Sequence, residues 1–228
     1  EGFSERGQQR LAVETPAGHL TPVAYLWTRT VTCKNPSCGA TVPLLRQTWL
    51  CKKKGRSVAL KVLAQKRQKK VRFEVVEASS ERSLGFDPDV GSEGGNATCP
   101  FCGTVADSDY VKVQGCAGQL NQQMMAIIGV RPSRQGKIYV SASDLPDFIP
   151  DDQAIRNRID QLCEQSGLTR PNEAIVTDAK NSCWTHLYGL KTFGDLFSPR
   201  QMLCLLTFVV AVRNAEGEMR RRGYDVQR

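Results

Sequence analysis

Apolar and polar residues alternate along much of the chain before residue 144, and this period of two predicts β-strands. Turn residues such as Gly, Asn and Pro interrupt the alternation, so neighbouring strands are expected to form hairpins. The expected strands are 23–32, 41–51, 57–64, 71–78, 110–113, 122–131 and 137–142. Residues 78–97 are rich in Ser, Gly, Asp and Glu, which predicts an exposed loop.

The pattern becomes helical after residue 144. Apolar residues recur at helical spacing over 150–167, which predicts one helix. A second helix is expected after Ser198, because Ser198 and Gln201 form a Ser-x-x-Gln capping box and Pro199 suits the first helical position. Its expected apolar face consists of Met202, Leu205, Leu206, Val209 and Val210.

These patterns predict an α+β fold, with an antiparallel β region followed by helices. The polar residues 1–22 are expected to form an extended lead-in. The strands occupy a β domain over 23–143, and residues 144–228 form a mainly helical segment.

Two cysteine pairs in the β domain have the spacing of metal ligands. Cys33 and Cys38 are separated by four residues, Cys99 and Cys102 by two, and each pair lies in a turn that ends in glycine. Four thiolates satisfy tetrahedral Zn²⁺ and leave no position open for water, so a structural zinc is expected. The 60 residues between the pairs make the β domain a zinc ribbon with an insertion. The alternative is four ordinary buried thiols.

The other five cysteines lack paired spacing and are interpreted as small apolar residues or surface thiols. They are Cys51, Cys116, Cys163, Cys183 and Cys204.

Positive charge is concentrated in two segments of the insertion. The chain has 31 Lys and Arg against 23 Asp and Glu, a net charge of +8, which favours a polyanionic partner such as nucleic acid. The candidate nucleic-acid contacts are Lys52, Lys53, Lys54, Arg56, Lys69, Lys70 and Arg72. Lysine and arginine at hairpin tips can neutralise phosphates. The alternative is a pair of solvated charged loops.

No catalytic residue is predicted from the sequence. The two histidines, His19 and His186, lie far apart in the chain, and no phosphate-binding glycine loop or Gly-x-Ser-x-Gly elbow is present. The longest apolar run, 202–212, is about half of the ~20 residues that a membrane span needs. With no apolar signal core either, a cytoplasmic protein without a membrane partner is expected. The residues alone therefore indicate a zinc-stabilised basic binding module.

Three segments of the chain resemble the adenine-specific DNA methylases that contain a zinc ribbon. They are residues 22–56, which include CKNPSCGA; residues 97–105 (ATCPFCGTV) with 111–127; and residues 187–215, which include LYGLKTFGDLFSPRQ. They cover about half of the chain and occur in the order found in that family. Of the family's functional residues, the resemblance carries over only the four metal ligands.

The resemblance implies an enzyme of bacterial or archaeal restriction-modification or phage defence. Such an enzyme has a Rossmann-like core and transfers a methyl group from S-adenosylmethionine to N6 of a flipped adenine. This chain contains neither the Asp-Pro-Phe-x-Gly-x-Gly cofactor loop nor an Asp/Asn-Pro-Pro-Tyr motif. It is therefore expected to be a central segment or a split subunit. S-adenosylmethionine would bind only in the complete enzyme.

The expected partners are DNA and the remaining methyltransferase domain or subunit. One alternative function is a scaffold that joins the methyltransferase halves without contacting DNA. Another is an independent enzyme that uses Cys51 or His186, although no oriented triad is apparent.

Overall fold

The computed structural model describes residues 13–15, 18–89, 91, 93–131, 134–146, 149–176 and 184–224. The chain divides into two compact units, Glu1–Ile149 and Pro150–Arg228. The predicted boundary, between residues 143 and 144, lies six residues earlier. Antiparallel sheets form the first unit and the two longest helices lie in the second, so the predicted α+β class is confirmed.

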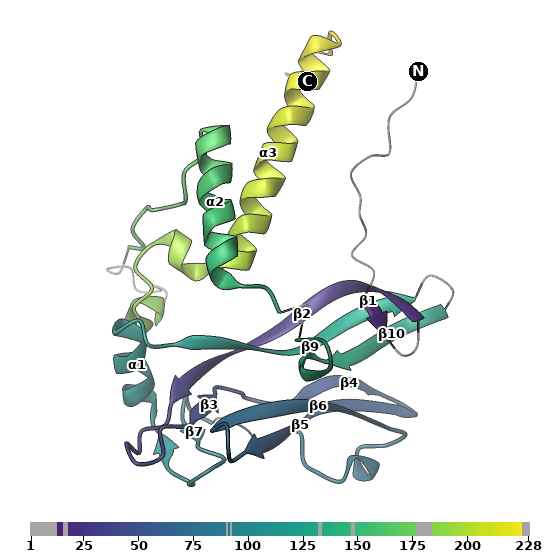
Figure 1. Ribbon diagram of the computed structural model, residues 1–228, viewed down its shortest axis with the longest axis vertical. Coiled ribbons are helices and arrows are strands. Elements are labelled where there is room, and N and C mark those ends of the chain that lie inside the picture. Colours follow the sequence, from purple (N-terminus) through teal and green to yellow (C-terminus); the bar gives the residue numbers. More distant parts are fainter. Residues whose placement is uncertain are drawn as a thin grey trace. The chain divides into compact units, whose positions relative to one another are not determined.

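The first sheet is built around two long central strands (Figure 1). Its strands are β1 (Val13–Thr15), β2 (Gly18–Thr32), β3 (Thr41–Pro43), β9 (Asn121–Arg131) and β10 (Arg134–Ser141). The order is β1-β2-β9-β10, and β3 pairs with the end of β2. Strand β2 begins inside the predicted lead-in because Leu20 is buried against Gly129 of β9. The two residues are so close that a Cβ added to Gly129 would lie 2.3 Å from Leu20 Cγ. Residues 1–12 and 16–17 of that lead-in lie outside the described residues.

The second sheet has the order β4-β5-β6 and is formed by the insertion. Its strands are β4 (Trp49–Lys53), β5 (Arg56–Gln65) and β6 (Lys70–Ala78). The prediction of one strand over 41–51 was wrong, because residues 44–48 cross from the first sheet to the second. The backbone amide of Leu44 donates to the carbonyl of Arg29 at 2.8 Å, whereas that of Thr48 donates to the carbonyl of Pro88 at 2.8 Å.

The two sheets pack face to face and share a core (Figure 1). Leu60, Val71 and Phe73 from the second sheet are buried together with Ala126 of β9. Burial of this apolar surface supplies the main attraction between the sheets. Polar contacts help to fix the position of one sheet on the other. The backbone amide of Val75 in β6, for example, donates to Ser141 Oγ in β10 at 2.9 Å.

Helix α1 (Ser108–Cys116) lies where the sequence predicted a strand over 110–113, so that prediction was wrong. Tyr110, Val111 and Val113 favour strands by propensity. The Asp107 side chain overrides that preference because it accepts a hydrogen bond from the Tyr110 amide at 2.8 Å and caps the helix. A short hairpin of β7 (Ala97–Thr98) and β8 (Val105–Ala106) precedes α1.

The remaining elements of the first unit are short. The predicted loop 78–97 contains the 3-10 helix η1 (Arg82–Leu84), and η2 (Ala142–Asp144) follows β10.

The second unit contains the two predicted helices, α2 (Asp152–Ser166) and α3 (Pro199–Arg221). The capping box of Ser198 and Gln201 is confirmed. Two 3-10 helices, η4 (Trp184–Tyr188) and η5 (Phe193–Leu196), precede α3. No helix among the residues described is long and apolar enough to cross a membrane.

The two long helices pack through one apolar cluster. Ile159 and Leu162 of α2 are buried with Met202 and Leu206 of α3. The predicted apolar face of α3 was partly wrong, because Leu205 is 43% exposed and Val209 is 38% exposed. The buried stripe runs along Met202, Leu206 and Val210, which are spaced four residues apart and therefore share one side of the helix.

Candidate metal centre

The four predicted ligands lie together in the first unit. The Sγ atoms of Cys33, Cys38, Cys99 and Cys102 are all within 4.8 Å of one another. The Cys33–Cys102 separation is 3.5 Å and the Cys38–Cys99 separation is 3.9 Å. A tetrahedral ion with metal–sulfur bonds of about 2.3 Å needs sulfur–sulfur edges of about 3.8 Å. A disulfide needs a sulfur–sulfur distance of about 2.05 Å, and all four thiols are free. The cluster can therefore hold a metal ion.

The first cysteine pair lies in the turn between β2 and β3. The Cys33 amide donates to the Ala40 carbonyl at 2.8 Å, and the Cys38 amide donates to the Asn35 carbonyl at 3.0 Å. Asn35 also accepts from the Ser37 amide through its side chain at 3.0 Å. Gly39 has a φ of +59°, which returns the chain to β3. These hydrogen bonds and the left-handed glycine place the thiols of Cys33 and Cys38 on the same side of the turn.

The second pair lies in the turn between β7 and β8 and repeats this geometry. The Cys99 amide donates to the Thr104 carbonyl at 2.9 Å, and the Gly103 amide donates to the Cys99 carbonyl at 3.0 Å. Gly103 has a φ of +75°. Phe101, between the two cysteines, packs against the core cluster of the second sheet. This contact fixes the second turn on the sheet sandwich.

Replacing Gly103 with alanine should destabilise the metal-loaded protein by about 1–2 kcal/mol, because a left-handed φ strains a residue with a Cβ. The added Cβ would meet no atom within 4 Å, so the metal should be retained. Urea denaturation measures the loss of stability, and the metal content of the purified variant shows whether the metal is retained. Gly217→Ala, within α3, is the matched control and should stabilise by up to about 1 kcal/mol. Equal effects of the two variants would contradict the role of the left-handed turn.

A second set of contacts joins the first cysteine turn to the start of helix α1 without metal. Lys34 forms an ion pair with Asp107, and Tyr110 Oη donates to the Thr32 carbonyl at 3.1 Å. The Lys34 side chain, followed by the Tyr110 amide, lowers the pKa of Asp107. Both partners of the ion pair are exposed, so solvent screens it and it stabilises little. No pattern in the sequence indicates this contact, because the partners are 73 residues apart.

The four thiols differ in their surroundings. Burial raises the pKa of Cys33 to about 12. A hydrogen bond with the Thr104 side chain, together with the Thr104 backbone, lowers the pKa of the exposed Cys102 to about 6. Metal binding at neutral pH must therefore displace the Cys33 proton, so the reaction releases protons and weakens as pH falls.

Thiol ligands fill all four tetrahedral positions, which is the arrangement of a structural site. The other described cysteines, Cys51, Cys116, Cys163 and Cys204, do not belong to the cluster. Cys183 lies outside the described residues.

The predicted nucleic-acid contacts separate into two groups. Residues 52–56 surround the turn between β4 and β5, and residues 69–72 follow the turn at the other end of β5. Ten residues of strand span about 30 Å, three times the Debye length of about 10 Å at 0.1 M salt. The two groups therefore act as separate patches.

Several of these cations have acidic partners. Lys52 pairs with Glu81 at 3.0 Å, Arg56 forms two bonds with Glu77 at 2.8 and 3.1 Å, and Arg72 pairs with Asp144 at 3.3 Å. In the part of the chain that the structure describes, no ion pair is found for the four exposed lysines Lys53, Lys54, Lys69 and Lys70.

In comparisons with protein-family models, curated proteins and solved structures, nothing matches this chain. The features that bear on its function are therefore the cysteine cluster and the charged surfaces.

Proposed function

We propose that the cysteine cluster holds one structural Zn²⁺ ion. Thiolates in two glycine-terminated turns are typical ligands of this ion, and sulfur–sulfur separations of 3.5 and 3.9 Å suit its tetrahedron. The ion would join the β2–β3 turn to the β7–β8 turn. The ion pair from the first turn to the start of α1 is exposed, so the metal would supply the main link between the two cysteine turns.

The metal-bound unit would serve as a DNA-binding module. The observation that carries this proposal is the pair of exposed, unpaired lysines, Lys53 and Lys54, at a hairpin tip of a chain with net charge +8. Such lysines neutralise phosphates and release counterions. The module would have no need of a catalytic group of its own.

The parent enzyme we propose is an adenine-specific DNA methylase. The resembling segments 22–56, 97–105 and 111–127 include the four cysteines and the strands β2, β7 and β9 around them. They leave out most of β5 and all of β6, the outer part of the insertion. The resemblance thus follows the metal centre and its supporting sheet. S-adenosylmethionine, bound by a core outside these residues, would supply the methyl group.

Binding to a labelled DNA duplex across a salt series tests this function. The zinc-loaded chain should bind at about 50 mM salt and weaken steeply toward about 200 mM. A variant with Lys52, Lys53, Lys54 and Arg56 changed to Glu should lose this binding. Absence of binding by the unaltered chain at about 50 mM salt would contradict the proposal.

A scaffold without DNA contact is the second candidate, favoured by one surface of α3. Its apolar side chains Leu205, Phe208 and Val212 are exposed by 43%, 67% and 50%. Exposed apolar residues at this density often mark a protein interface. Sizing chromatography tests it: self-association that Phe208→Glu abolishes, in a chain that does not bind DNA, would favour the scaffold.

A further inference from the structure

Two hairpin tips from different sheets meet in the first unit, at the end of β5 that lies away from the cysteine cluster. Arg56, beside the β4–β5 turn, donates from Nη2 to the carbonyl of Lys137 on β10 at 3.0 Å. A Cβ added to Gly136 would lie 3.9 Å from Arg56 Nη1. The β9–β10 hairpin therefore brings its own cations, Arg131 and Lys137, to the Arg56 side of the β4–β5 turn.

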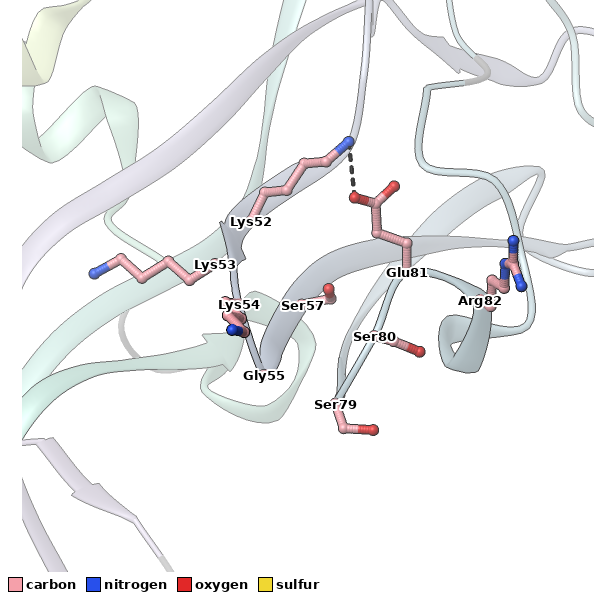
Figure 2. Close-up of a pocket in the computed structure, with 9 residues that line it drawn as sticks. All are labelled: Lys52, Lys53, Lys54, Gly55, Ser57, Ser79, Ser80, Glu81 and Arg82. Atoms are coloured by element: carbon pink, nitrogen blue, oxygen red, sulfur yellow. Dashed lines mark ion pairs between the residues drawn. The ribbon is translucent and has the colours of Figure 1, made fainter.

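A first hollow of about 500 Å³ opens at the β4–β5 turn (Figure 2). Lys52, Lys53, Lys54 and Arg82 line it together with Ser57, Ser79 and Ser80. Its one carboxylate, Glu81, is paired with Lys52. Lys53 points away from that pair in Figure 2, so its ammonium group is not neutralised by Glu81. Ammonium, guanidinium and hydroxyl donors together suit phosphate oxygens.

A second hollow of about 430 Å³ lies at the β9–β10 hairpin. Arg131 and Lys137 line it with Arg56 and Glu77, and this carboxylate is held by Arg56. Arg131 Nε is buried and has no hydrogen-bond partner in the structure. A guanidinium donor without an acceptor is unusual in a folded protein, and Arg131 is one of the residues that line this hollow.

We propose that the two hollows form a single surface, the basic end, that binds the phosphate backbone of duplex DNA. Seven cations line them against two carboxylates, and both carboxylates are already paired. One phosphate ion would occupy only one hollow, whereas a DNA strand presents phosphates in series to both. Phosphate contacts position DNA without reading its bases. This inference rests on the proposed DNA-binding function.

The basic end excludes three of the seven contacts expected from the sequence. Lys69, Lys70 and Arg72 lie about 30 Å away, at the far end of β5. There the carbonyl of Lys69 accepts from the Thr41 amide at 2.8 Å, just after the first cysteine turn. These residues therefore lie at the end of β5 that is near the cysteine cluster, here called the metal-bearing end. They are expected to make no phosphate contact.

Two matched variants test the inference, each with three exposed lysines changed to glutamine. One carries Lys53→Gln, Lys54→Gln and Lys137→Gln at the basic end, and the other Lys66→Gln, Lys69→Gln and Lys70→Gln at the metal-bearing end. Equal charge is removed from each. Binding to a labelled duplex is measured across a salt series, with metal content confirming that both variants fold.

The basic-end variant should lose at least tenfold in affinity at about 0.1 M salt, and its log–log salt slope should become shallower by about 2.7, or 0.9 for each phosphate contact. The other variant should change less than threefold. Equal losses, or a loss confined to the metal-bearing end, would overturn the inference but leave DNA binding intact. Tighter binding to duplex RNA would overturn the choice of DNA. Absence of binding by the unaltered chain would overturn both the inference and the proposed function.

Discussion

Replacing Cys99 with serine should abolish metal binding and unfold the first unit. Cys99 is 2% exposed, and its thiol is one of the four that could hold the metal. A structural zinc contributes an apparent folding free energy of about 10–16 kcal/mol at pH 7, as large as the whole stability of a typical domain, about 5–15 kcal/mol. The ion pair of Lys34 with Asp107, which links the first cysteine turn to α1, is exposed and cannot replace it. Elemental analysis and near-UV circular dichroism measure the two effects.

Cys204→Ser is the matched control for this experiment. Cys204 is exposed on α3, and its thiol lies outside the cluster. The control should keep one metal per chain and the spectrum of the unaltered protein. Retention of the fold by the Cys99 variant, together with an absence of metal from the unaltered protein, would show that the cluster is four ordinary thiols.

Replacing Phe73 with alanine should cost about 3–5 kcal/mol of unfolding free energy. Phe73 is 2% exposed and lies in the cluster that joins the two sheets. Its removal leaves a cavity in the cluster against which Phe101 of the second cysteine turn packs. Urea denaturation of the metal-loaded protein, followed by Trp fluorescence, measures the loss.

Phe208→Ala provides the same chemical change at an exposed site. Phe208 is 67% exposed on α3, so its truncation should alter stability by no more than about 0.5 kcal/mol. A Phe73 variant as stable as this control would mean that the sheets are not held together by that cluster.

The two cysteine turns could be predicted from the sequence because their geometry is local. Each pair is shaped by a short turn that ends in Gly39 or Gly103, both with left-handed φ values. The helix after Ser198 was predictable for the same reason, since its capping box involves residues three positions apart. In both cases contacts between residues a few positions apart determine the structure.

Predictions failed where distant contacts or one capping residue decided the outcome. The propensity of Tyr110 and Val111 favoured a strand, but the Asp107 cap produced helix α1. The expected strand over 41–51 was divided because its halves bond to different sheets. The basic end depends on Arg56 reaching Lys137, 81 residues away, and no sequence pattern indicates that contact.

The proposed zinc centre is tested most directly by measuring the metal that the chain binds. The purified chain should contain one zinc per molecule, and X-ray absorption should show four sulfur ligands at about 2.3 Å. That result would support a closed structural centre formed by Cys33, Cys38, Cys99 and Cys102. A chain that folds without metal, or one whose zinc has nitrogen or oxygen ligands, would contradict it.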